Sequence, residues 1–305
     1  MMLKVSRNNP AVPAAPTGTQ QVQPLNNEHK AEVLSFLAAR PQHTFIKTSW
    51  INDNGLVSSF NRGAFYGCRD AKGQLEGVAL IGHITLFEAR TDSAVSAFAQ
   101  LTQSCPSARA VLGEENKISQ FMTHYEKGGM SPRLFCRELL LEKRSAENLD
   151  KVQSLRIARS EELELVVTVH AQTAFEESGV NPLDVDPSGF RERCARRVDR
   201  GRVWVAIEDG RVKFKADIVS DTSDVVYVEG VYVSPTHRGN GFGAQCMTQL
   251  TNHLLERTRA VCLLVNQTNS GAQASYRKAG YKFREYYDTL YLQPQSPAAD
   301  QEMAA

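Results

Sequence analysis

One junction, between Tyr227 and Thr258, constrains the fold more than any other part of the chain. It opens with the apolar, β-branched run YVEGVYVSP, passes through THRGNGFG and continues into AQCMTQLTNHLLERT. The first segment predicts a β-strand and the last predicts a helix, so an arginine and three glycines stand where the strand gives way to the helix. Glycine at the start of a helix is costly unless the space left by the missing side chain is needed. The junction therefore indicates either a tight turn or a loop that wraps a phosphate.

The order of the predicted elements indicates a mixed α/β sheet that is built twice. Residues 153–292 read as a strand, two helices, three strands joined by turns, the glycine loop with its helix, and then a strand, a helix and a strand. Antiparallel strands that give way to a strand–helix–strand unit imply a mixed sheet. The preceding segment follows a reduced version of the same plan. We expect a disordered tail at 1–24, a degenerate domain at 25–150, a complete domain at 151–293 and a second disordered tail at 294–305.

Composition is that of an ordinary globular protein and argues against several classes of function. The 305 residues are 42% hydrophobic, and 35 basic against 34 acidic residues give a net charge of +1. That balance argues against a dedicated nucleic-acid or membrane-surface binder, and we interpret the six arginines within residues 191–202 as a solvated helix face. The N-terminus lacks the apolar stretch of a secretory signal, so we expect a cytoplasmic protein. The six cysteines are scattered without metal-ligand spacing, which predicts free thiols and no metal site.

A helix that begins directly after a glycine loop can bind an anion. Its first amides have no partner within the helix, and the helix dipole favours a negative charge there. Gly239, Gly241 and Gly243 would let the backbone approach an oxygen closely, and Arg238 adds a positive charge. The spacing is neither that of the nucleotide P-loop nor that of the dinucleotide fingerprint. Taken alone, the loop fits an ordinary turn as well as a phosphate site.

Two blocks of sequence together resemble the GNAT superfamily of acetyltransferases, which use acetyl-coenzyme A. The loop RGNGFG at residues 238–243 matches the family's Arg/Gln-x-x-Gly-x-Gly/Ala motif. Asn269, Ala272 and Tyr276, followed by the glycine–aromatic pair at 280–281, match its Asn-x-x-Ala-x-x-x-Tyr block. The resemblance covers roughly residues 153–292. The whole chain is similar to bacterial two-domain members in which a degenerate GNAT-like half precedes a complete one.

The resemblance implies a site for acetyl-CoA and no metal. The pyrophosphate of coenzyme A would lie on the loop amides, and its pantetheine arm would pair with the preceding strand like an added strand. Gly230 would interrupt that strand with a bulge that splays the sheet, and Asn269 would hydrogen-bond the arm. The cofactor-binding residues implied in this way are Val231, Tyr232, Val233, Arg238, Gly239, Asn240, Gly241, Phe242, Gly243, Ala244 and Asn269.

Acetyl transfer to an amine needs an acid for the leaving thiolate and a base for the amine proton. Tyr276 matches the family's general acid, although a tyrosine on an amphipathic helix can also simply pack in the core. The backbone amide of Val233 would stabilise the oxyanion. Glu229 is the candidate base, and strand alternation predicts that it shares a face with Val231 and Val233. Its alternative roles are a salt-bridged strand residue and a substrate anchor.

The expected acceptor is a primary amine of a small molecule or a protein, acetylated by direct attack in a ternary complex. The connection at residues 175–187 would form one wall of its site, where four carboxylates either favour a cationic amine or are simply solvated: Glu176, Glu177, Asp184 and Asp186.

The first half lacks an arginine–glycine loop at the equivalent junction, IGHITLFEARTDSAVSAF, so we expect it to bind no coenzyme A. It either completes the acceptor pocket or only stabilises the fold or forms a homodimer. The alternative function for the whole chain is an acyl-CoA-binding regulatory module without turnover. Tyr276 favours the enzyme, because a sensor needs no general acid.

Overall fold

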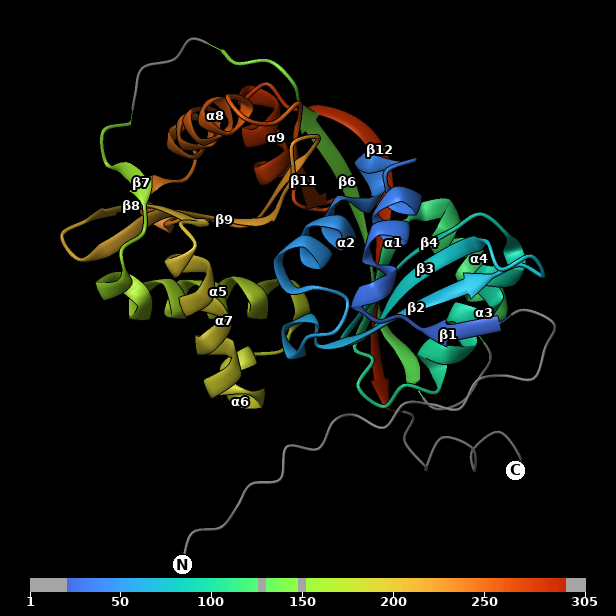
Figure 1. The fold of residues 1–305 in the computed structure, drawn as a ribbon. Helices are drawn as coiled ribbons and strands as arrows, with labels where there is room; N and C mark the ends of the chain where they lie inside the picture. The colour runs from blue at the N-terminus through green and yellow to red at the C-terminus, as the bar shows by residue number, and fades with distance from the viewer. Residues whose placement is uncertain (1–20, 126–129, 148–151, 295–305) are drawn as a thin grey trace, which may run out of the picture. The chain divides into compact units, whose positions relative to one another are not determined.

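The computed structural model describes residues 21–125, 130–147 and 152–294, which form two compact units (Figure 1). One unit comprises residues 1–36, 54–134 and 290–305, and the other comprises residues 37–53 and 135–289. Segments 37–53 and 135–147 of the predicted first domain therefore belong to the second compact unit. The predicted domain boundary at residue 150 lies outside the described residues.

The first unit is a sheet covered by helices. Its strands follow the order β1-β2-β3-β4-β5, and then come the C-terminal end of β12 and the N-terminal end of β6. A core of apolar side chains from the strands and from α3 and α4 holds it together. The elements are β1 (Gln21–Pro24), α1 (Lys30–Leu37), β2 (Gly63–Arg69), β3 (Leu75–Gly82), β4 (Ile84–Ala89), α3 (Asp92–Gln103), β5 (Ala110–Glu114), α4 (Glu115–His124), β6 (Met130–Lys143) and β12 (Lys282–Pro294).

The predicted N-terminal tail is too long by one strand. Residues 21–24 form β1, which pairs antiparallel with β2 from Gln21 opposite Arg69 to Pro24 opposite Tyr66. Val22 is buried in the core of the first unit, so residues 21–24 are part of the folded domain. Residues 1–20 and 295–305 of the two predicted tails lie outside the described residues.

The second unit repeats the plan in a fuller form, with strands in the order β12-β6-β11-β10-β9-β8-β7. Helices α8 and α9 cover one face of this sheet, and α5 and α7 cover the other (Figure 1). Its further elements are α2 (Pro41–Asn54), β7 (Leu155–Ile157), α5 (Leu163–Ser178), α6 (Pro182–Val185), α7 (Pro187–Asp199), β8 (Val203–Glu208), β9 (Arg211–Asp221), β10 (Val226–Val233), α8 (Phe242–Leu255), β11 (Val261–Asn266) and α9 (Ser270–Lys278).

Helix α2 was not predicted from the sequence, and it packs within the second unit. The Ser220 hydroxyl donates to the Phe45 carbonyl at 2.8 Å, and the amide of residue 221 donates to Ser49 Oγ at 3.0 Å. Arg202 forms an ion pair with Asp53 at the end of the helix. These contacts explain why residues 37–53 belong to the second unit, although they precede most of the first along the chain.

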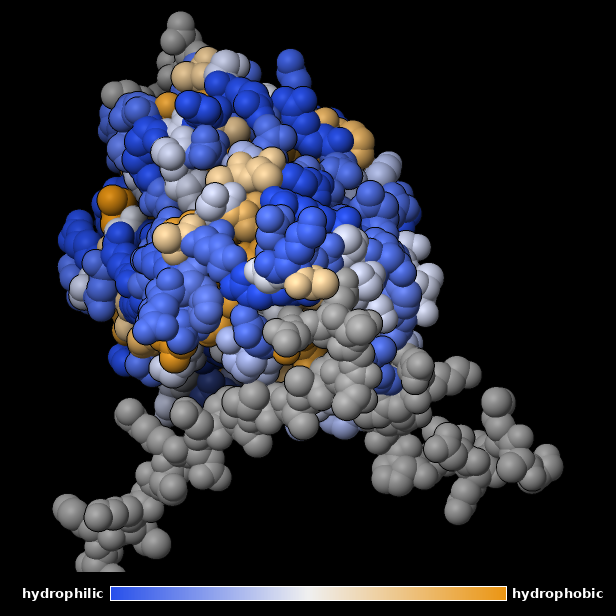
Figure 2. Space-filling view, turned by 45° about the vertical axis from the view of Figure 1, so that its right-hand side comes forward, coloured by the Kyte–Doolittle hydropathy of each residue, from blue (hydrophilic) through white to orange (hydrophobic). Residues whose placement is uncertain are grey.

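The described surface and thiols are consistent with an ordinary globular chain. No helix in the described ranges is both long and apolar enough to cross a membrane. The face in Figure 2 is mostly hydrophilic, with small and separated apolar groups. All six cysteines are free, as predicted, and Cys68, Cys194, Cys246 and Cys262 are buried.

Candidate functional site

Strands β10 and β11 separate partway along their length. They pair in parallel at two positions, Val226 with Val261 and Tyr227 with Cys262. Strand β11 continues to pair with β6 as far as Asn266, so the sheet opens between β10 and β11. Residues 229–233 of β10 are all partly exposed. The splay expected from the sequence is therefore present, and it leaves an edge of β10 to which an extended chain can add.

A β-bulge at Gly230 accompanies the splay. Strand β10 advances three residues from Glu229 to Tyr232, while β9 advances only two, from Asp217 to Lys215. Gly230 has a φ of +57°, a conformation that glycine adopts readily. Opposed residues on neighbouring strands point to the same face, so Glu229 lies on the face of Asp217. Tyr232 lies on that face too, opposite Lys215.

The bulge overturns one prediction about the base. Val231 and Val233 pack against the apolar cluster that includes α8 and α9. Glu229 instead contacts residues on the face covered by α5 and α7. The prediction that Glu229 shares a face with the two valines is therefore wrong, because the extra residue reverses the alternation of the strand.

The start of α8 has the properties of an anion site. Its N-cap is Gly241, with φ +88°, which provides no side-chain cap, and Gly239 has φ +79°. No acidic residue lies in the first turn of α8. The positive end of the helix dipole is therefore not compensated by a side chain of that turn.

Two neighbours of the loop allow close packing and add a positive charge beside it. A Cβ on Gly243 would approach Val233 Cγ2 to 2.8 Å, so glycine permits the close packing of α8 on β10. A Cβ on Gly241 would lie 3.0 Å from Lys278 Nζ, which places an ammonium beside the loop. Sequence reasoning missed Lys278, because it lies on α9 rather than in the loop motif. Arg238 turns back instead, and its Nε donates to the Val233 carbonyl at 2.9 Å.

Two asparagines that were predicted to bind the cofactor accept hydrogen bonds from amides in the first turn of a helix. Asn240 Oδ1 accepts a hydrogen bond from the amide of Phe242 at 3.1 Å. Asn269 is the N-cap of α9, and its Oδ1 accepts from the amide of Ala272 at 3.0 Å.

Tyr276 is buried on the face of the sheet that α8 covers. It is 7% exposed and belongs to the cluster against which Val231 and Val233 pack. Burial, followed by the charge of Glu177, raises the pKa of Tyr276 above its ordinary value. The hydroxyl therefore stays protonated at neutral pH.

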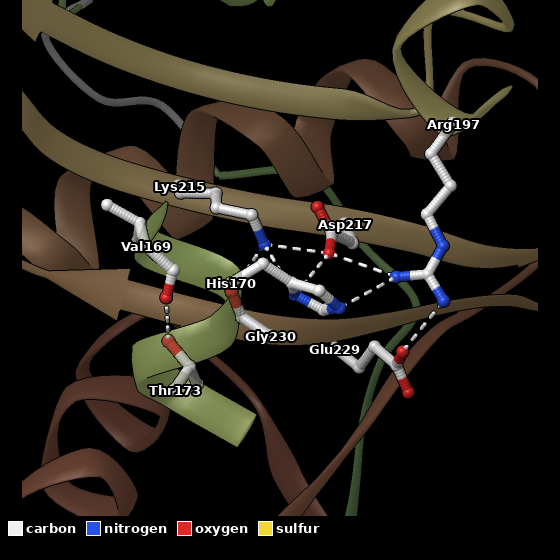
Figure 3. Close-up of polar contacts among 8 residues, drawn as sticks. All are labelled: Val169, His170, Thr173, Arg197, Lys215, Asp217, Glu229 and Gly230. Carbon is white, nitrogen blue, oxygen red and sulfur yellow. Dashed lines mark hydrogen bonds and ion pairs between the residues drawn. The ribbon is translucent and has the colours of Figure 1, made fainter. Parts of the chain in front are cut away.

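Glu229 is a salt-bridged strand residue, which was one of its expected alternative roles, and its partner belongs to a charged network that the sequence did not predict (Figure 3). Arg197 NH2 lies 3.4 Å from Glu229 Oε1, and its NH1 donates to Asp217 Oδ2 at 3.1 Å. Lys215 Nζ donates to the same Asp217 oxygen at 2.7 Å and to the carbonyl of Gly230 at 3.3 Å. One carboxylate thus joins both cations, and each cation contacts one residue at the bulge.

The network runs from the interior to solvent. The side chain of Lys215 is 0% exposed and that of Asp217 is 2% exposed, whereas Glu229 retains 37%. Burial raises the pKa of Glu229 above its ordinary value, although Arg197 opposes the shift. The attraction of Lys215 and the other cationic groups outweighs burial at Asp217, whose pKa is lowered.

His170 closes the network as a neutral group. Its Nδ1 lies 3.2 Å from both Lys215 Nζ and Asp217 Oδ2, and its Nε2 lies 3.4 Å from Arg197 NH1. Burial, followed by the charge of Lys215, lowers the pKa of His170 to about 3. Arginine and lysine can only donate, so one nitrogen of the neutral ring accepts from Arg197 or from Lys215, and the other carries the hydrogen. The ring stacks on Phe190, with centroids 5.2 Å apart.

The arginine-rich segment is not a uniformly solvated face. Arg191 fits that interpretation, since its side chain is 55% exposed and pairs with Glu164. Arg197 and Arg202 retain only 28% and 16% exposure, and both form ion pairs within the unit. The interpretation is wrong for these two, because their carboxylate partners come from segments distant in sequence.

The carboxylates of residues 175–187 differ in their surroundings. Asp186 caps α7 and accepts from Arg193 NH1 at 3.0 Å, so its contacts are those of a structural residue. Glu177 is at the end of α5, where loss of hydration, followed by the charges of Glu229 and Glu138, raises its pKa to about 7. The mutual repulsion of these three glutamates favours a positive charge near them.

The equivalent junction of the first unit lacks these properties. The N-cap of α3 provides a capping side chain, which the N-cap Gly241 of α8 cannot, because Thr91 Oγ1 accepts from the amide of Ala94 at 3.4 Å. Asp92 places a carboxylate in its first turn. A capped helix start with a negative charge disfavours a phosphate.

Comparison with known proteins identifies the fold. Residues 167–281 match the Acetyltransferase (GNAT) family, and no curated protein matches the chain. A GNAT-family acetyltransferase from Colwellia psychrerythraea is 13% identical, with 90% of this chain and 100% of that chain covered and a TM-score of 0.56. A tandem GNAT protein from the clavulanic acid biosynthesis pathway is 11% identical, with 92% and 99% covered and a TM-score of 0.57. A GCN5-related N-acetyltransferase from Sphaerobacter thermophilus is 13% identical, with 92% and 97% covered and a TM-score of 0.55.

At these identities the structural likeness concerns the fold alone. It extends over nearly the whole chain, and one of the matched structures is itself a tandem GNAT protein. The predicted family resemblance and the predicted mixed α/β fold with tandem GNAT-like parts are confirmed.

Proposed function

We propose that the protein transfers the acetyl group of acetyl-CoA to a primary amine of a small molecule or a protein, on the premise that residues 167–281 match the GNAT family of acetyltransferases. The observation that carries the proposal is the combination of two features in one unit. Strand β10 splays from β11, and the strand then leads through a glycine loop into α8, whose N-cap is a glycine without a capping side chain. The first feature suits an amide-bearing chain and the second suits a phosphate, and coenzyme A carries both.

The residues around the loop suit coenzyme A. The amides from Gly239 to Ala244 would hold the pyrophosphate, for which the amide of Phe242 would leave Asn240 Oδ1, and Lys278 would supply charge beside Gly241. Val231, Tyr232 and Val233 would pair with the pantetheine arm through their backbone. When bound, acetyl-CoA supplies the acetyl group as a thioester together with its thiol leaving group.

Tyr276 is the proposed general acid. Its hydroxyl is protonated at neutral pH, as in an ordinary tyrosine, and burial raises its pKa further. Tyr276 lies on the face that carries Val231 and Val233. The hydroxyl would donate its proton to the departing sulfur. The backbone amide of Val233 would hold the oxyanion.

Glu229 is the proposed base. Its partly exposed carboxylate has a raised pKa, which makes it a stronger proton acceptor than an ordinary glutamate. It would take the proton of the acceptor amine directly or through water. Because the bulge reverses the strand, the acid and the base would act from opposite faces of the sheet at the splayed edge.

Two further observations favour direct attack over a covalent acyl-enzyme. Cys246 of α8 and Cys262 of β11 are the thiols next to this site along the chain, and both are buried. Burial raises the pKa of each to about 12, so both remain thiols at neutral pH and are poor nucleophiles.

The alternative function is an acyl-CoA-binding regulatory module without turnover. The decisive experiment incubates the full chain with acetyl-CoA and a panel of primary amines and peptides, and follows thiol release. Amine-dependent release that is lost in Tyr276→Phe supports the transferase. Tight acetyl-CoA binding by calorimetry without release from any amine would favour the regulatory module instead.

A further inference from the structure

The base and the bulge beside it share a single anchor on β9 (Figure 3). Asp217 Oδ2 accepts from Arg197 at 3.1 Å and from Lys215 at 2.7 Å. Arg197 extends to the carboxylate of Glu229, and Lys215 extends to the carbonyl of Gly230. Two consecutive residues of β10 are therefore held through two cations that meet at one buried carboxylate.

Without such a contact Glu229 would have no fixed position. A glutamate with 37% of its side chain exposed can adopt several rotamers. The neighbouring carboxylates Asp217, Glu138 and Glu177 repel its charge. The guanidinium of Arg197 both opposes that repulsion and defines a direction for the side chain, because its planar fork contacts Asp217 with one nitrogen and Glu229 with the other.

We propose that Arg197 is the positioning residue of Glu229: Asp217 fixes the guanidinium, and the guanidinium holds the carboxylate beside the splayed edge of β10. Lys215 complements it by holding the Gly230 carbonyl, so that the side chain of the base and the backbone of the bulge keep one geometry. The assignment rests on the proposed function only in the role it gives Glu229. The charged and titratable groups that act on that carboxylate are Arg197, Lys215, Asp217, Glu138, Glu177 and Tyr227.

The test compares two substitutions that separate charge from position. Arg197→Gln removes the charge and the fork. Arg197→Lys keeps a positive charge but cannot bridge two carboxylates in the same way. Arg193→Gln is a matched control, because Arg193 lies one turn earlier on α7, has 26% exposure against 28% for Arg197, and pairs with Asp186 at 3.0 Å.

The first readout is the titration of the Glu229 carboxyl by ¹³C NMR, with its resonance identified by its absence in Glu229→Gln. We expect its pKa to rise by about 1 unit or more in Arg197→Gln and to stay near the parent value in Arg193→Gln. The second readout is the pH profile of amine acetylation. In Arg197→Gln, the pKa of the acid limb of this profile should rise together with the pKa of the Glu229 carboxyl. In Arg197→Lys, kcat should fall roughly 10- to 100-fold through misplacement of the base, with acetyl-CoA affinity unchanged.

The outcomes separate this proposal from the proposed function. An unchanged Glu229 titration in folded Arg197→Gln overturns the positioning role, whatever the activity. If Arg197→Gln does not fold, as judged by circular dichroism, Arg197→Lys decides, and an unchanged kcat in that variant overturns the role. A parent protein that acetylates no amine contradicts the proposed function, while the coupled titration of Glu229 still supports the contact from Arg197.

Discussion

The neutral imidazole of His170 should make the protein lose stability in mild acid. In the folded chain the ring is buried beside Lys215 and Arg197, and its pKa is lowered to about 3. In the unfolded chain it titrates near the ordinary value of about 6.5. Between these two values the unfolded state binds a proton that the folded state does not bind, so the free energy of unfolding falls as the pH falls.

The size of the effect follows from the two pKa values. At about pH 5 the folded ring is still neutral, whereas the unfolded one is almost fully charged. The loss is about 1.4 kcal/mol for each pH unit below the unfolded value, which gives about 2 kcal/mol at pH 5 relative to pH 7.5. Glu138, Glu177 and Glu229 have raised pKa values and act in the opposite direction over the same range. Only a comparison with a variant isolates the histidine.

The assay is urea unfolding of the parent protein and of His170→Gln at about pH 7.5 and about pH 5. Glutamine keeps hydrogen-bonding groups at this position but cannot titrate. The parent should lose about 2 kcal/mol more than the variant between the two conditions, because every other titrating group is common to both. Parallel changes in the two proteins would refute the burial of a neutral His170 among these cations.

Three further predictions concern the cofactor, the acid and the chain's organisation. Gly241→Val should weaken acetyl-CoA binding at least about tenfold by calorimetry. The control is Gly210→Val, which has a comparable φ of +68° and no atom near its Cβ; it should lower the free energy of unfolding by a similar amount, about 1–2 kcal/mol, and leave the affinity for acetyl-CoA unchanged. Equal affinities of Gly241→Val and the parent protein would exclude the loop as the binding site. Tyr276→Phe should lower turnover roughly 10²–10⁴-fold with little change in affinity, and parent-like turnover with chemistry rate-limiting would remove the hydroxyl from the mechanism. A fragment of residues 151–305 should not unfold cooperatively, because it lacks β6, which pairs with β11 from Lys143 to Glu138. A sharp thermal transition of this fragment would contradict the need for β6.

Local patterns in the sequence predicted most of the second unit. Its strands and main helices follow apolar periodicity, and the glycine loop follows from a motif that needs only adjacent residues. Helix α2 was missed because its buried side includes the polar residues Thr44, Lys47 and Ser49 beside Phe45 and Ile51. Polar residues on the buried side obscure the apolar spacing that indicates a helix.

The charged network was missed for a different reason. Along β9, Lys215 and Asp217 alternate with apolar residues, and such alternation usually indicates a strand with one solvated face. Here α5 and α7 cover that face, and the charges are balanced by Arg197 from the second of these helices and by Glu229 from β10. A partner that arrives from another element leaves no signal in the spacing of the strand itself.

The bulge connects the two halves of the proposed chemistry. Gly230 combines φ +57° with crowding, because a Cβ there would lie 3.2 Å from both Asp217 Oδ2 and Lys215 Nζ. A side chain at residue 230 would therefore crowd the network. The extra residue in β10 turns Glu229 toward the network and Val231 toward the face that α8 and α9 cover. A regular strand would place both on one face. In the proposed function, one inserted residue would thus let a single strand offer a backbone edge to coenzyme A and, from its other face, a carboxylate to the acceptor.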